Sequence, residues 1–106
     1  MTTFDDREKA FENKFKYDEE MKFKATARRN RLVGMWAAEK LGKTGDDATA
    51  YAKEVVAADF DRPGEEDVIE KLLGDFAAAG LTLGRADVLF QMERLFGQAV
   101  EQLRHE

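Results

Sequence analysis

The chain of 106 residues contains no cysteine, and it has one proline and one histidine. Without cysteine it can form neither disulfides nor thiolate metal sites, and it has no thiol nucleophile. The histidine, His105, is the penultimate residue, so neither a histidine-based catalytic triad nor a mixed histidine and cysteine metal site can be assembled. We interpret His105 as part of a frayed tail. We expect a protein that is not an enzyme, with no catalytic residue, metal or cofactor.

Long hydrophobic runs are also missing from the chain. No apolar stretch approaches the roughly 20 residues that a membrane-spanning helix needs. The first residues, Met-Thr-Thr-Phe-Asp-Asp, are too acidic for a signal peptide. The lack of cysteine suits a reducing compartment, and the length is typical of a single domain. We therefore expect one cytoplasmic unit that does not insert directly into a membrane.

Charged residues make up 37% of the chain, and they are unevenly distributed along it. Residues 20–41 contain six basic and two acidic residues, whereas residues 42–106 contain seven basic and fourteen acidic ones. Because the net charge is −5 and no recognition module is visible, we expect the basic patch to pair with acidic parts of the same chain or with one protein partner, and not with nucleic acid. The basic patch consists of Lys22, Lys24, Arg28, Arg29 and Arg31.

The composition favours helix throughout, because Ala, Glu, Lys, Leu, Asp and Arg dominate and no alternation of polar and apolar residues persists. Glycine-containing turns at residues 42–45, 61–64 and 80–84 divide the chain into four segments. Thr44 and Thr82 are expected N-caps of the segments that follow them. Short connections between helices imply antiparallel neighbours and therefore a small bundle.

Apolar residues recur at helical spacing in the last three segments, and such stripes must be buried against a neighbour. The spacing predicts helices over residues 45–59, 65–79 and 84–104. The apolar positions of these helices are Ala48, Tyr51, Ala52, Val55 and Val56, then Val68, Ile69, Leu72, Leu73 and Phe76, and finally Val88, Leu89, Met92, Leu95, Phe96, Ala99, Val100 and Leu103.

The first segment, residues 3–41, is too long for an ordinary bundle helix. Phe4, Phe11 and Phe15 form a narrow aromatic stripe on its helical projection. The charged stretch Lys16–Lys22 interrupts this stripe, and apolar residues resume on a displaced face at Met21, Ala25, Leu32, Val33 and Trp36. We predict that residues 20–106 form a small four-helix bundle with Trp36 in its core. Residues 1–19 are predicted to be a mobile segment with conditional helicity, because a helix of that length is marginal without packing.

Periodicity alone is compatible with two uses of the aromatic stripe. It can cap the bundle, or it can bind a groove of a partner through spaced anchors.

Two short motifs invite a chemical interpretation that the sequence does not support. Gly42-Lys43-Thr44 matches the end of a phosphate-binding P-loop, but Ala37 stands where the loop needs glycine and the preceding residues are helical. We interpret this motif as a helix stop and N-cap. The acidic pairs and runs at residues 46–47 and 65–67 are interpreted as cap and surface charges, because acids are favoured in a first helical turn.

Three strings of residues carry a resemblance to a known family. They are Phe-Asp-Asp-Arg-Glu-Lys-Ala-Phe-Glu at residues 4–12, Arg-Arg-Asn-Arg at residues 28–31 and Gly-Met-Trp-Ala-Ala at residues 34–38. With Lys14 and Phe15, they resemble the zeta subunit, the inhibitor protein of α-proteobacterial F-type ATP synthases. The resemblance covers essentially the whole chain, and the later helices add length and spacing to it.

The resemblance implies a four-helix bundle that carries an inhibitory segment at residues 1–19. By this resemblance the segment would enter a catalytic interface of the soluble head of the ATP synthase and would stop rotation in the hydrolytic direction. The expected partner is that soluble head, with its catalytic and rotor subunits. The protein would then be peripheral to the inner membrane through the ATP synthase. The alternatives are a nucleotide-responsive subunit and a structural assembly subunit without inhibitory activity. The expected partner-binding residues are Phe4, Asp5, Asp6, Arg7, Lys9, Phe11, Glu12, Lys14, Phe15 and Lys16.

Overall fold

A computed structural model describes the backbone of residues 2–61 and 65–106, and the side chains of residues 19–59 and 65–106. Over these residues the chain forms four helices and no strand, which confirms the all-α prediction. The helices are α1 (Thr2–Lys40), α2 (Gly45–Asp61), α3 (Glu66–Ala78) and α4 (Arg85–Arg104). Each lies within two residues of its expected bounds.

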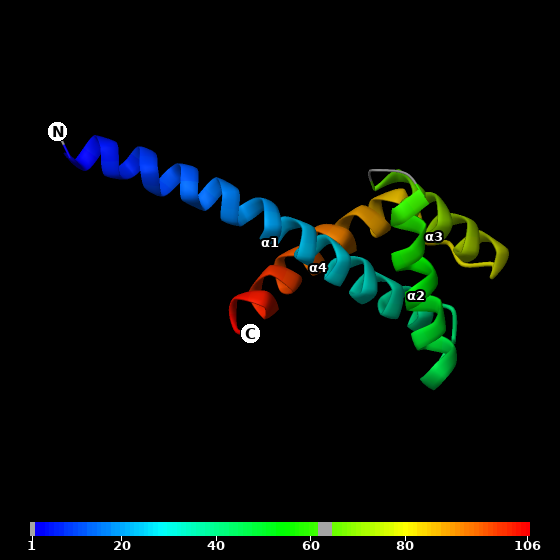
Figure 1. Ribbon diagram of the computed structural model, residues 1–106. Coiled ribbons are helices and arrows are strands. Elements are labelled where there is room, and N and C mark those ends of the chain that lie inside the picture. Colours follow the sequence, from blue (N-terminus) through cyan, green and yellow to red (C-terminus); the bar gives the residue numbers. More distant parts are fainter. Residues whose placement is uncertain (1, 62–64) are drawn as a thin grey trace.

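Helix α1 is the axis on which the other helices assemble (Figure 1). Its second half packs against both α2 and α4, and α3 closes the group by contacting α2 and α4. The first half of α1 runs away from the other three helices. The molecule is consequently 62 Å long and 25 by 23 Å across, and its radius of gyration of 16.9 Å exceeds the about 13 Å of a compact domain of this size.

The charged stretch Lys16–Lys22 does not end α1, which continues as one helix from Thr2 to Lys40. Five of its seven residues are lysine, glutamate or methionine, which favour helix. The stretch therefore changes which face of the helix is apolar and leaves the helical backbone continuous. The conditional helicity of residues 1–19 stays a prediction.

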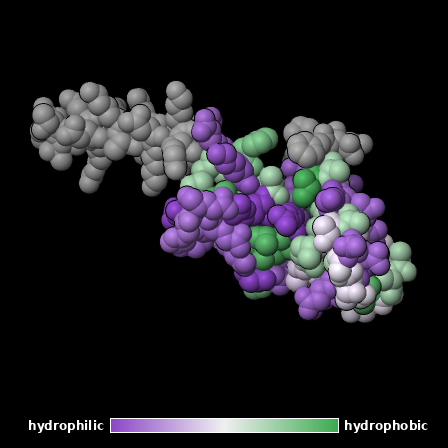
Figure 2. Space-filling model, turned by 60° about the horizontal axis from the view of Figure 1, so that its bottom comes forward, coloured by the Kyte–Doolittle hydropathy of each residue, from purple (hydrophilic) through white to green (hydrophobic). Residues whose placement is uncertain are grey.

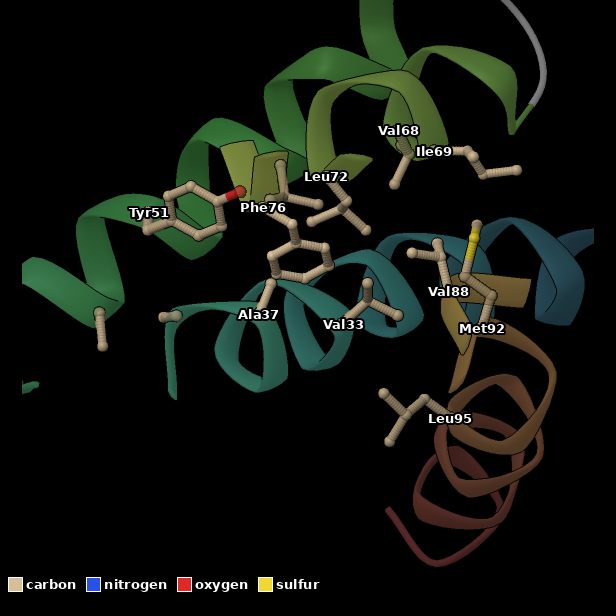
Figure 3. Packing of buried hydrophobic residues seen from close by; sticks show 13 residues of the cluster. Val33, Ala37, Tyr51, Val68, Ile69, Leu72, Phe76, Val88, Met92 and Leu95 are labelled. Atoms are coloured by element: carbon tan, nitrogen blue, oxygen red, sulfur yellow. The ribbon is translucent and has the colours of Figure 1, made fainter. Parts of the chain in front are cut away.

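The core lies where the apolar stripes of the four helices meet (Figure 3). Phe76 reaches from α3 toward Val33 and Ala37 of α1, and all three side chains are fully buried. Trp36 packs edge-on against Phe76 with ring centroids 5.6 Å apart, so it contacts the core as predicted, but its side chain is only partly buried. The helical spacing thus identified most of the buried positions, although Leu89, expected on the apolar stripe of the last helix, is 40% exposed.

Helix ends confirm one of the turn predictions and correct another. Gly42 has a φ of 78°, and the N–H of Lys43 donates to the carbonyl of Ala38 at 2.8 Å, so this motif is a helix stop as predicted. The N-cap at Thr82 was wrong: α4 is capped at Gly84, whose N–H donates to the Asp87 carboxylate at 2.9 Å. The Asp87 carboxylate, in the first turn of α4, thus accepts a backbone hydrogen bond at the start of the helix, which is the role that was expected of Thr82.

The C-terminal end of α4 carries contacts that the sequence did not predict. His105 is the C-cap of α4, with its backbone N–H bonded to the carbonyl of Gln102 and its ring nitrogen 2.9 Å from the Glu101 carboxylate. Both side chains of this contact are exposed, so the frayed-tail interpretation stays a prediction. Among the described residues, no helix is long and apolar enough to cross a membrane.

Candidate functional site

The predicted partner-binding residues, from Phe4 to Lys16, all fall in the first half of α1. Their side chains lie outside the described residues. The helical backbone passes through all of them and leads away from the bundle (Figure 1). At 1.5 Å per residue, the stretch from Thr2 to position 18 spans about 25 Å. The half of α1 that packs in the bundle therefore sets the position of any binding site that these residues form.

A buried polar cluster fastens that packed half of α1 to the beginning of α3. Arg29 is 4% exposed, and its guanidinium donates to Asn30 Oδ1 from Nε (3.2 Å) and Nη2 (2.9 Å). Its Nη1 donates to Glu65 Oε1 at 2.8 Å. Charge-assisted bonds of this kind give both energy and fixed geometry. We call Arg29, Asn30 and Glu65 the arginine cluster.

The pairing of the basic patch with later acidic residues is confirmed at two positions. Arg29 pairs with Glu65 in the arginine cluster, and Arg28 pairs with Glu106 near the C-terminus. Glu65 and Glu66 are surface charges, as predicted, but each also forms an ion pair with another element. The partner of Glu66 is Arg85 of α4, whose guanidinium lowers the pKa of the Glu66 carboxyl.

Two grooves flank α1 where it joins the bundle. The α4-side groove has a volume of about 560 Å³ and is lined by Lys22, Thr26, Arg29, Asp59, Glu65, Leu89, Met92, Glu93 and Phe96. The α2-side groove has a volume of about 380 Å³ and is lined by Glu19, Lys22, Phe23, Thr26, Ala27, Asn30, Val56 and Asp59. Figure 2 shows a mostly hydrophilic face on which hydrophobic residues form small, separate groups.

Phe23 is a surface residue that the sequence interpretation missed. Its side chain is 73% exposed, although it stands in the part of α1 that was assigned to the bundle. The signal that points to it is a row of positions four residues apart, Phe11, Phe15, Glu19 and Phe23, which neighbour one another along a helix. The sequence-based prediction placed the aromatic residues on one narrow stripe along the helix axis. A row of positions four residues apart is inclined to that axis, so the stripe did not include Phe23.

The described residues offer contact surfaces and no assembled centre for chemistry. No group of three or more histidine, cysteine, aspartate or glutamate residues among them could hold a metal ion. The raised pKa of the Tyr51 hydroxyl arises from burial and from its 2.6 Å hydrogen bond to Asp75, so it reports a packed structural contact.

The sequence profile of the family described as ATPase inhibitor subunit zeta matches residues 1–102. The chain belongs to this family. A protein known from a solution NMR structure is 50% identical to the chain and has a TM-score of 0.71, over 80% of this chain and 96% of that one. No curated protein sequence matches. Membership supports a role as an inhibitor of the ATP synthase, since the family is one of inhibitor subunits and not of enzymes.

Proposed function

We propose that this protein inhibits ATP hydrolysis by an F-type ATP synthase. The first half of α1 enters a catalytic interface of the soluble head, and the bundle stays outside. A helix held between subunits blocks the rearrangement of that interface which each catalytic step requires, so rotation stops. The protein is then located at the ATP synthase and acts by binding alone.

The observation that carries this proposal is the continuity of α1. Its second half is packed against α2 and α4, and its first half runs on from it without a break. Starting a helix costs much more than extending one, so the packed half supplies the nucleus for the projecting half. Ordering the projecting half on binding therefore costs less free energy than ordering a separate peptide of the same length.

The composition of residues 1–19 suits insertion between protein surfaces. Phe4, Phe11 and Phe15 are spaced as anchors of a helix that binds in a groove. The acidic and basic residues among them are almost balanced, which favours register and steering over general attraction to charge. The charged residues of this segment that we expect to contact the partner are Asp5, Asp6, Arg7, Lys9, Glu12, Lys14 and Lys16.

The test is a titration of ATP hydrolysis by the isolated soluble head of an α-proteobacterial ATP synthase. The proteins compared are the full chain, the double variant Phe11→Ala/Phe15→Ala and the matched control Phe90→Ala. Phe90 is an exposed phenylalanine of α4 that lines neither groove. Circular dichroism and melting temperature are recorded for all three. We expect the full chain and the control to inhibit equally, and the double variant to inhibit at least tenfold more weakly with an unchanged melting temperature.

Two results would contradict the proposal. Full inhibition by the double variant would show that the first half of α1 does not carry the activity. A melting temperature that falls in parallel with the inhibition would show that the aromatic stripe stabilises the bundle, as in a purely structural subunit.

A further inference from the structure

Phe23 is the most exposed large apolar side chain among the described residues. One exposed phenylalanine needs no explanation by itself. Phe23, however, lines the α2-side groove together with Ala27 of α1 and Val56 of α2. The groove is therefore an apolar recess with an aromatic ring at its edge, located where α1 leaves the bundle.

The same groove contains a hydrogen-bond donor that has no partner. Asn30 is 1% exposed, and its Oδ1 accepts two N–H groups of Arg29, which fixes the orientation of the amide. The Asn30 Nδ2 therefore points away from the guanidinium, and within the described residues nothing accepts its hydrogens. Because Nδ2 is itself buried, a group outside the chain does not reach it in this structure, and the case for a contact at the groove rests on Phe23 and the apolar part of the lining.

The α4-side groove presents less apolar surface at its edge. Its most exposed apolar side chain is Leu89, at 40%, against 73% for Phe23 in the α2-side groove. Arg29 and Glu65 in the α4-side lining pair with each other at 2.8 Å. The exposure of Phe23 favours the α2-side groove as the place where another protein contacts the bundle.

The α2-side groove is continuous with the face of α1 that we propose to be inhibitory. Position 15 precedes Glu19 by one helical turn, and Phe23 follows Glu19 by one turn. The positions Lys22 and Thr26 then continue the same face into the groove. A surface that grips α1 around Phe15 reaches Phe23 within about 12 Å along the axis.

We propose that the α2-side groove is a second contact with the ATPase head. The occupant is the rim of the interface that α1 enters, with an apolar side chain lodged between Phe23, Ala27 and Val56. The inhibitory surface then extends beyond residue 19 onto the bundle, and the inference rests on the function proposed above.

The experiment repeats the hydrolysis titration with full-length variants of the groove. Phe23→Ala removes the aromatic edge, and Ala27→Glu places a longer charged side chain in the recess while keeping a good helix former. Phe90→Ala is the matched control, since Phe90 is 63% exposed and lies outside the groove. We expect a rise of about tenfold in the half-inhibitory concentration for each groove variant, as for an interface anchor, and less than twofold for the control.

The possible results separate the two proposals. Wild-type inhibition by both groove variants, with loss in Phe11→Ala/Phe15→Ala, overturns the second contact and leaves the inhibitory helix standing. Equal losses in Phe23→Ala and Phe90→Ala also overturn it, because the effect would then follow any exposed phenylalanine. Absence of inhibition by the wild-type chain rejects the proposed function itself. Because Phe23 and Ala27 are exposed, melting temperatures close to that of the wild type are part of the expected result.

Discussion

The arginine cluster allows a quantitative prediction, because its members differ in burial. Arg29→Met keeps most of the side-chain volume and removes three hydrogen bonds. Its main effect is on Asn30, which is fully buried and would lose both partners of its Oδ1. An unpaired buried acceptor costs about 1–3 kcal/mol. Glu65 contributes little to the loss, since its side chain is 54% exposed and water replaces the guanidinium.

We therefore expect Arg29→Met to lower the free energy of unfolding by about 2–3 kcal/mol, and Glu65→Gln to lower it by less than about 1 kcal/mol. The double variant Arg29→Met/Asn30→Leu should be more stable than Arg29→Met alone. Replacing both members of a buried polar pair by apolar side chains is far less costly than leaving one of them unpaired.

Urea unfolding monitored by circular dichroism at a constant denaturant slope measures all three variants. Equal destabilisation by Arg29→Met and Glu65→Gln would show that the ion pair, and not the buried amide, dominates the cluster. A double variant less stable than Arg29→Met would refute the argument from the unpaired acceptor.

Two further predictions concern the contacts of α2. A Cβ on Gly34 would lie 2.7 Å from the Cα of Ala52. Gly34→Ala should therefore destabilise the bundle by about 1–2 kcal/mol in urea unfolding. Gly97 has open space around it, so Gly97→Ala should stabilise the bundle by about 0.5–1 kcal/mol. A stabilising Gly34→Ala would disprove the close crossing of α1 and α2. Burial and the hydrogen bond to Asp75 raise the pKa of Tyr51 above its ordinary value, so its contribution to stability is complete below pH about 10 and is lost as the pH rises further. Unfolding free energies between pH 8 and 11 should therefore fall more steeply for the wild type than for Tyr51→Phe, and parallel curves would contradict the assignment.

Local periodicity was sufficient to predict the helices and most of their buried faces. Val68, Ile69, Leu72 and Phe76 were expected to form one apolar face of the third helix, and all four are buried. The reason is physical: a helix places positions three and four residues apart on the same side, whatever lies opposite. The prediction of Thr82 as N-cap was wrong because the Asp87 carboxylate accepts the N–H of Gly84. Residue spacing alone does not decide which of two nearby acceptors binds a backbone N–H.

The sequence by itself therefore determined the helical class, the apolar stripes and the family. Only the tertiary structure decided which faces meet. Arg29 and Glu65 are 36 positions apart, and Gly34 touches Ala52 across a helix crossing, so neither contact follows from local spacing. The exposure of Phe23 and the unpaired amide of Asn30 have the same origin, since both depend on how closely α2 approaches α1. Burial and hydrogen-bond satisfaction are properties of packed surfaces, and the packing of these surfaces joins residues that are distant along the chain.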